Sequence, residues 1–188
     1  MALPKVMTFR GTDLLEVKTV SDTSEYTNPL GPFKVDSVQG FELEIEFDED
    51  ELFGDEEKKD VYAKIIGMKG SWTSGQVNLE TLGIMTDGTL AESGTTPSQM
   101  SKLSIGPTRP PYLRWRFVCL YQGGEDAGAN GAYEIEIFKA RLTAPKLSVQ
   151  SKAYGELSGG FNAALPVNLP SGESVLAYGT IKKVETAA

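Results

Sequence analysis

Apolar and acidic residues alternate strictly over residues 41–47, which read FELEIEF. Side chains of a β-strand point alternately to its two faces, so the pattern predicts a strand with one apolar and one negatively charged face. Like charges on one strand face repel, and surface strands usually mix polar residue types, so three glutamates in a row, Glu42, Glu44 and Glu46, are unusual. The face either lines a functional surface or simply points to solvent.

The same strand belongs to a predicted long hairpin. Residues 35–47 form the outgoing strand and residues 61–69 the returning one. Between them, residues 48–60 contain eight acidic residues and two lysines, a composition typical of a solvated loop at a hairpin tip. Leu52 and Phe53 are apolar residues inside this charged run, so they are candidates for anchoring a partner.

A second hairpin is predicted from residues 113–121 and 132–142, joined by a glycine-rich turn over residues 122–131. One register places Trp115 opposite Ile137 and Phe117 opposite Ile135 on the apolar face. Cys119, opposite Tyr133 on that face, is interpreted as a small core residue. The other face of residues 133–137 is acidic again, because it carries Glu134 and Glu136, and the same register puts Arg116 opposite Glu136. This acidic face could join that of residues 41–47 in one anionic surface.

The remaining chain reads as short strands and loops. Strands are expected at residues 14–20, 147–149, 156–165 and 175–184, and loops at 21–33 and 89–111, where glycine, serine, threonine and proline gather. Residues 77–85 are the best helical segment, with Val77, Leu79, Leu82 and Met85 near one face. The prediction is one mainly β domain over residues 1–188: an antiparallel sandwich or barrel with one short helix and a long protruding hairpin.

Composition removes several classes of function. The 26 acidic and 18 basic residues give a net charge of −8, which disfavours a nucleic-acid reader. The chain has no histidine, the commonest general base and metal ligand, and it lacks phosphate-loop, dinucleotide and nucleophile-elbow motifs. No catalytic, cofactor or metal site is therefore expected. No apolar stretch suits a secretion signal or a membrane span, so we expect synthesis in the cytoplasm and no membrane partner.

The order of these features resembles that of the major tail tube protein of long-tailed (siphovirus-type) bacteriophages. The carriers are the acidic-faced hairpin of residues 41–69, the Gly70-Ser71-Trp72 exit, the helix-like residues 77–85, the strand of residues 132–142 continuing to 149, and the closing residues 154–165. The likeness covers about residues 5–185 and rests on order and length, because none of these pieces is a diagnostic motif.

The resemblance implies a non-enzymatic structural subunit. Such proteins are β-sandwich subunits that form homo-hexameric rings and stack into a tube in the virion tail, with the tape measure and tail terminator proteins as further partners. DNA passes through the acidic lumen without specific binding. The implied lumen-facing residues are Glu42, Glu44 and Glu46, and then Glu134 and Glu136. The implied contacts with the adjacent ring are Asp50, Glu51, Leu52, Phe53 and Asp55.

Other readings stay open. Another virion protein, for tail completion or head decoration, has similar chemistry. A glycoside hydrolase could use two of the hairpin glutamates as acid and base, since carboxylate-only catalysis needs no histidine. A pilus or surface subunit is disfavoured by the lack of an export signal.

Overall fold

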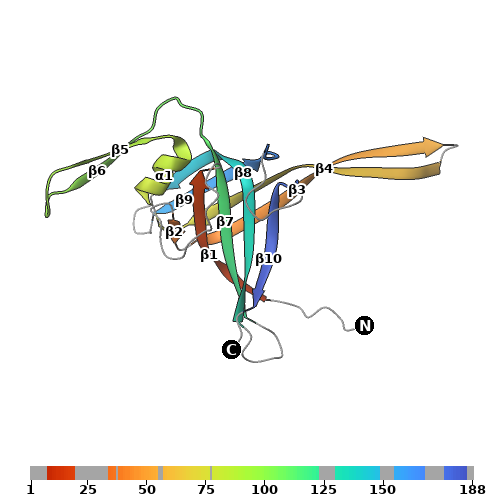
Figure 1. The fold of residues 1–188 in the computed structure, drawn as a ribbon, viewed down its shortest axis with the longest axis horizontal. Helices are drawn as coiled ribbons and strands as arrows, with labels where there is room; N and C mark the ends of the chain where they lie inside the picture. The colour runs from red at the N-terminus through yellow and green to blue at the C-terminus, as the bar shows by residue number, and fades with distance from the viewer. Residues whose placement is uncertain are drawn as a thin grey trace.

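The computed structural model describes residues 8–19, 34–36, 38–54, 57–76, 78–122, 130–148, 155–167 and 176–185. In these residues the fold is mainly β with one short helix, as predicted (Figure 1). The elements are β1 (Thr8–Thr19), β2 (Lys34–Asp36), β3 (Val38–Gly54), β4 (Glu57–Ser74), α1 (Leu79–Thr86), β5 (Thr89–Ser93), β6 (Met100–Ser104), β7 (Tyr112–Gln122), β8 (Asn130–Ser148), β9 (Glu156–Ala163) and β10 (Gly179–Glu185).

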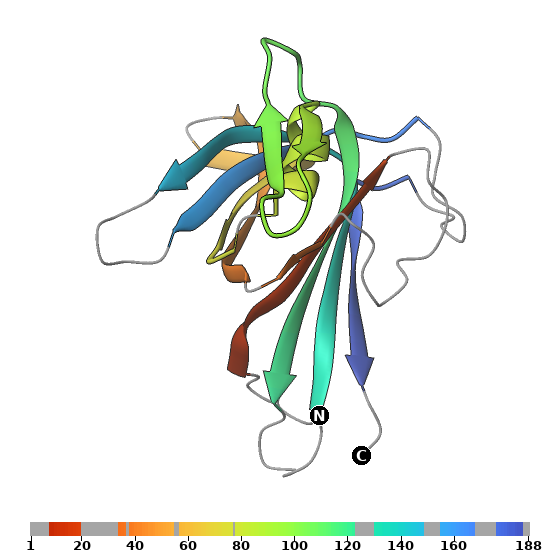
Figure 2. The same ribbon diagram turned by 90° about the vertical axis from the view of Figure 1, so that its left-hand side faces the viewer.

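Eight strands form one antiparallel sheet in the order β2-β1-β7-β8-β9-β4-β3, with β10 also paired to β8. The long strand β8 changes partner along its length: its first part, to Ile137, pairs with β10, and its last part, from Ala140, pairs with β9. Figure 2 shows the end of β8 and β9 turning away from the direction of β1, β7 and β10. The sheet therefore bends back on itself, and β1 and β3 come into contact.

The core lies where the two halves of the bent sheet face each other. Trp115, Phe117 and Phe161 are fully buried. The Phe41 ring centroid on β3 lies 4.0 Å from that of Phe117 on β7, and the Trp115 and Phe161 centroids are 5.6 Å apart. Buried aromatic rings contribute large apolar areas and favour such tilted contacts. The apolar faces predicted from alternation thus form the core.

The register predicted for the second hairpin is confirmed. Trp115 pairs with Ile137, Phe117 with Ile135, Cys119 with Tyr133 and Arg116 with Glu136. Cys119 is buried, as expected for a small core residue. On this face the β7 residues are buried, while Tyr133 and Ile135 of β8 are half-buried. A slip by one residue would turn the whole apolar set to the other face, so the register has no equivalent alternative.

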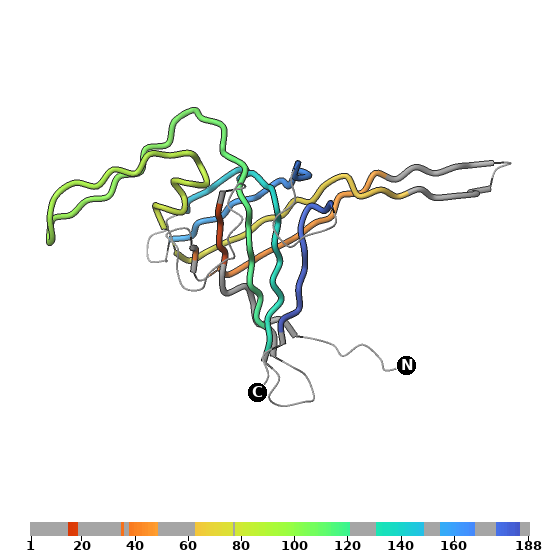
Figure 3. The backbone as a smooth tube through the Cα atoms, viewed as in Figure 1, coloured from red at the N-terminus to blue at the C-terminus, as the bar shows by residue number. Residues whose placement is uncertain are grey.

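The first hairpin extends further as strand than predicted. The ladder between β3 and β4 continues to Gly54 opposite Glu57, so most of residues 48–60 is paired strand and not loop. Backbone hydrogen bonds form the ladder whatever the side chains, and Asp48 lies opposite Lys64, an oppositely charged cross-strand pair. Figure 3 shows β3 and β4 leaving the body side by side, and Figure 1 shows the two strands as a long projecting arm. Residues 55 and 56 lie outside the described part.

The prediction of a loop over residues 89–111 was also wrong in part, because β5 and β6 pair there and form the β5–β6 hairpin. It projects from the body on the side opposite to the β3–β4 hairpin (Figure 1). Leu103 of β6 packs against the core, which secures the base of this polar hairpin.

The helix lies at residues 79–86, close to the predicted 77–85. The Asn78 side chain accepts hydrogen bonds from the backbone N–H groups of Glu80 and Thr81, which caps its first turn. Of the residues predicted near one face, Leu82 and Met85 are buried and Leu79 is partly buried, while Val77 lies outside the described residues.

Gly70 of β4 tests how closely β4 packs between its neighbouring strands β3 and β9. A Cβ atom at Gly70 would meet the carbonyl oxygen of Glu42 and the ring of Phe161, whereas one at Gly106 has only Thr108 Cγ2 at 4.0 Å. We expect Gly70→Ala to lower the free energy of unfolding by about 1–3 kcal/mol, as overpacking does. Denaturant unfolding measures it, with Gly106→Ala as the control. Equal stability of the two variants would contradict the packing described.

Candidate functional surfaces

The first candidate surface is the acidic strip, defined as Glu42, Glu44 and Glu46 of β3. The neighbouring Phe41 and Leu43 pack against the core, so strand alternation turns the three glutamates to the outer face. Glu42 and Glu44 are exposed and Glu46 is half-buried. The one-sided acidic pattern thus corresponds to a one-sided acidic surface.

Two residues of β4 contact the acidic strip. Lys69 Nζ lies 3.1 Å from Glu46 Oε1 and 3.2 Å from Glu44 Oε1, and Ser71 Oγ donates a 3.3 Å hydrogen bond to Glu42 Oε2. The hydrogen bonds that Lys69 donates to Glu46 and Glu44 raise the pKa of its ammonium group above the ordinary value. Lys69 therefore stays charged to higher pH, and its pairing is lost only as the pH rises through that raised pKa. One cation against three carboxylates leaves the strip negative.

A surface groove of about 580 Å³ lies beside the strip. Glu42, Glu44, Lys69, Thr143 and Asn162 are among its lining residues. In the described residues no group of three or more histidine, cysteine or acidic side chains could hold a metal ion. The groove presents the carboxylates of Glu42 and Glu44, the pair of groups that a glycoside hydrolase would use as acid and base.

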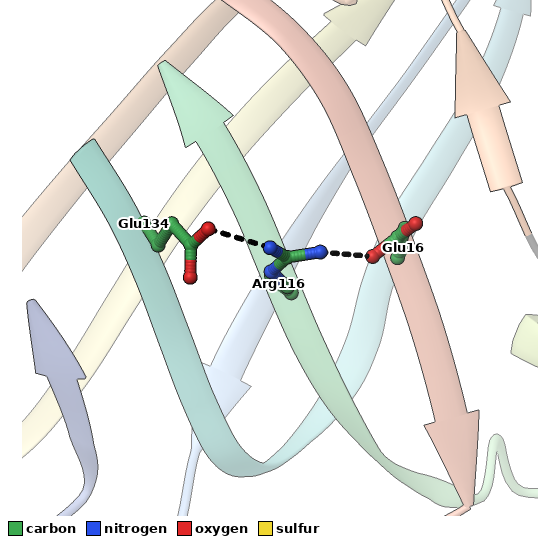
Figure 4. Close-up of polar contacts among 3 residues, drawn as sticks. All are labelled: Glu16, Arg116 and Glu134. Carbon is green, nitrogen blue, oxygen red and sulfur yellow. Dashed lines mark hydrogen bonds and ion pairs between the residues drawn. The ribbon is translucent and has the colours of Figure 1, made fainter. Parts of the chain in front are cut away.

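The second pair of candidates, Glu134 and Glu136, belongs to an arginine network. Arg116 of β7 donates hydrogen bonds to Glu16 Oε2 at 2.7 Å and to Glu134 Oε1 at 2.6 Å (Figure 4). Arg114 forms an ion pair with Glu136. Arg116 is opposite Glu136 in the register, as predicted, but the ion pairs between β7 and β8 run diagonally. The Arg116–Glu16 pair joins directly opposite residues of β7 and β1. The network links β1, β7 and β8.

The arginine network sets two guanidinium groups against three carboxylates, and all five side chains are buried or half-buried. Burial alone would lower the pKa of the Arg116 guanidinium, but the hydrogen bonds to Glu16 and Glu134 raise it above its ordinary value. Arg116 therefore carries its positive charge at neutral pH. Glu16 and Arg114 are each less than a tenth exposed. The face that looked acidic in sequence thus carries arginine cations among its carboxylates.

The two acidic faces point away from each other. Phe41 of β3 contacts Phe117 of β7 across the core, and Glu42 lies on the far side of β3. Ile135 of β8 is paired with Phe117 and shares its core face. Its chain neighbour Glu134 therefore points to the opposite face of β8. The acidic strip and the arginine network therefore occupy opposite outer surfaces of one subunit, and they do not merge into one surface within it.

Sequence reasoning missed the hairpin stem, defined as Ile45, Phe47, Ile65 and Ile66, whose side chains are 41–52% exposed. Ile45 and Phe47 continue the face of Phe41 and Leu43, and Phe47 lies opposite Ile65. The core face of the hairpin therefore runs outward beyond the part that the body covers. Contiguous exposed apolar residues of this kind mark interaction surfaces. The signal was the alternation itself, which continues to Phe47.

The residues predicted for contacts at the hairpin tip are placed only in part. The backbone of Asp50, Glu51, Leu52 and Phe53 belongs to β3, but the description does not extend to their side chains. Asp55 lies outside the described residues. Their role therefore stays a prediction.

Comparison with known proteins gives no assignment. No protein-family model matches the chain, and a search of curated proteins finds no match. The described residues include no helix long and apolar enough to cross a membrane.

Arg116 is the residue whose loss should destabilise the arginine network most. Arg116→Met leaves Glu16 and Glu134 without that partner in a largely buried place, so we expect the free energy of unfolding at pH 7 to fall by about 2–4 kcal/mol. Lys69→Met is the control, because its glutamates are in water, and it should have a far smaller effect. Denaturant unfolding compares the two. Similar losses would show that the network adds no more than a surface ion pair.

Proposed function

We propose that this chain is a structural subunit of a phage tail tube. Copies would form homo-hexameric rings that stack into a tube, with DNA passing through an acidic lumen during ejection. The observation that carries the proposal is the β3–β4 hairpin, which projects from the body with one face acidic and the other apolar and uncovered. A monomer gains nothing from an arm of this kind, whereas an assembly can bury the apolar face.

The strand edges also favour self-assembly. β3 stands at one end of the sheet order, and β10 pairs with β8 alone among the described strands. Long edge strands present unpaired backbone groups that proteins usually protect. If neighbouring subunits extended each other's sheets into a closed barrel, the ring would remove those edges.

The charge distribution supports the acidic strip as the lumen wall. Glu42, Glu44 and Glu46 outnumber their one cation, and a negative wall repels DNA phosphates and leaves a path of low friction. Glu134 and Glu136 pair with arginines on the opposite outer surface. We therefore propose that the acidic strip, and not Glu134 and Glu136, lines the lumen. Asp50, Glu51, Leu52, Phe53 and Asp55 remain the proposed tip contacts to the adjacent ring, and the tape measure and tail terminator proteins remain proposed partners in the virion.

Two other functions fit individual features. A tail completion or head decoration protein would share the fold and the charge, but it would not form tubes of constant bore. A glycoside hydrolase could use Glu42 and Glu44, which line the groove. Release of sugar by the wild-type chain, abolished in Glu42→Gln or Glu44→Gln, would favour the enzyme over the tube.

The hairpin stem provides the first test. Phe47→Ser with Ile65→Ser removes up to about 1.5–3 kcal/mol of apolar burial per residue if each is covered on assembly. We expect self-association to weaken while the subunit keeps its thermal transition, since both side chains are about half exposed in the monomer. Sedimentation velocity over a concentration series measures association. Leu147→Ser, an equally exposed position on β8, is the matched control, and unchanged association of the stem variant would remove the stem from the interface.

Charge reversal tests the lumen. Glu42, Glu44 and Glu46 changed to Lys alter each subunit by six charge units, so DNA ejection from assembled particles should slow and become dependent on salt. Glu80, Glu92 and Glu156 changed to Lys provide the same charge change at exposed carboxylates elsewhere. Normal ejection by particles that carry the strip variant would show that the strip does not face the DNA.

A further inference from the structure

Two cations share one tyrosine ring at the start of β7. The Arg141 guanidinium carbon lies 3.8 Å from the Tyr112 ring centroid, and Lys139 Nζ lies 4.8 Å from it. Tyr112 is opposite Arg141 in the β7–β8 ladder, so the backbone fixes this arrangement. We call these three residues the cationic cluster. Each cation gains from the ring, but the two positive charges repel each other.

The cluster differs from three other cations of the sheet, because neither Lys139 nor Arg141 has a carboxylate partner among the described residues. Arg114, Arg116 and Lys69 each pair with a glutamate. In the part of the chain that the structure describes, no carboxylate lies within ion-pair distance of Lys139 or Arg141, and Arg141 Nε is buried without a hydrogen-bond acceptor. A buried donor without an acceptor is costly, so the cluster is suited to receive an external carboxylate.

The acidic strip of the same chain does not serve this purpose. Arg141 pairs with Asn162, Asn162 with Lys69, and Lys69 with Glu44. Glu44 is thus three strands away from Arg141, roughly 14 Å at the usual spacing of about 4.8 Å. That separation exceeds the screening length of about 8 Å at physiological salt. The acidic strip of the same chain therefore does not supply a counterion to the cluster.

The β3–β4 hairpin carries the complementary charge. Residues 48–60 contain eight carboxylates and two lysines, and the first of these carboxylates, that of Asp48, is exposed. The strand from Phe47 to Gly54 extends the arm by roughly 25 Å at about 3.3 Å per residue, which is enough to reach across a neighbouring subunit. A contact between an arm and a different surface of an identical chain can repeat from copy to copy.

We propose that the cationic cluster of one copy binds the acidic hairpin of a second copy, through carboxylates among Asp48, Glu49, Asp50 and Glu51. The inference rests on the proposed tube function and deepens it, because it names the surface that receives the hairpin. The contact is a charge-paired docking of an arm on the Tyr112–Lys139–Arg141 surface, and it is weakened by salt.

Reciprocal charge reversal tests the proposal. One variant reverses the cluster, with Lys139→Glu and Arg141→Glu. The other reverses the hairpin, with Asp48, Glu49, Asp50 and Glu51 changed to Lys. Each variant alone should need at least about tenfold more protein for half-assembly, because two or more ion pairs per contact become repulsive. An equimolar mixture should assemble again, since each hairpin then meets a cluster of opposite charge.

Controls separate the proposal from loss of folding and from other ligands. Lys102→Glu with Arg109→Glu makes the same charge change at exposed cations elsewhere and should assemble like the wild type. If the cluster reversal does not fold, Lys139→Gln with Arg141→Gln replaces it, and the salt dependence of its assembly should be shallower than that of the wild type. Sedimentation velocity and thermal melts give the readouts.

Three outcomes would overturn the docking. They are normal assembly of the cluster variant, failure of the mixture to assemble although both variants are folded, and binding of labelled duplex DNA that depends on the cluster while assembly does not. Any of these leaves the tube proposal intact as long as the wild type assembles. A wild-type chain that stays monomeric at every concentration and salt would overturn both proposals.

Discussion

Aromatic packing between the two halves of one bent sheet is the constraint on which the rest of the structure depends. Phe41 of β3 lies against Phe117 of β7, and Trp115 and Phe161 complete the contact. This packing is possible because β8 pairs with β10 and then with β9, so that β9, β4 and β3 turn back over β1 and β7. The same contact decides which residues face outward, since every neighbour of these rings along a strand points away from the core.

The bend also explains why the hairpin is two-faced beyond the body. The apolar face that contributes Phe41 and Leu43 to the core continues as Ile45 and Phe47, where the side chains are exposed. Its reverse side is the acidic strip with Lys69. An arm of this kind can bury its apolar side against a second surface while its hydrated acidic side repels a polyanion.

Local patterns in the sequence predicted the features that depend on neighbouring strands. Strict alternation and one consistent register were enough to place Trp115, Phe117 and Cys119 against Ile137, Ile135 and Tyr133. The spacing of apolar residues likewise predicted the helix within a residue or two of its observed ends. The two loop predictions failed because backbone pairing does not require apolar residues, so the acidic β3–β4 arm and the polar β5–β6 hairpin gave no strong strand signal.

Features that depend on distant pairing could not be predicted. Glu16 meets Arg116 only because β1 lies beside β7, a hundred residues later in the chain. Glu134, which was predicted to belong to an acidic surface, is a second ion-pair partner of the same Arg116. Likewise, the cationic cluster exists because β7 begins opposite Arg141.

The central claim is that this β subunit, with its projecting β3–β4 and β5–β6 hairpins, builds a tube with the acidic strip on its inner wall. Electron cryomicroscopy of the purified protein at high concentration, with and without the other tail proteins, tests it most directly. The account predicts tubes of constant bore built from stacked six-membered rings, with Glu42, Glu44 and Glu46 facing the bore. Particles that remain single subunits under all these conditions, or tubes whose bore is lined by another face, would contradict it.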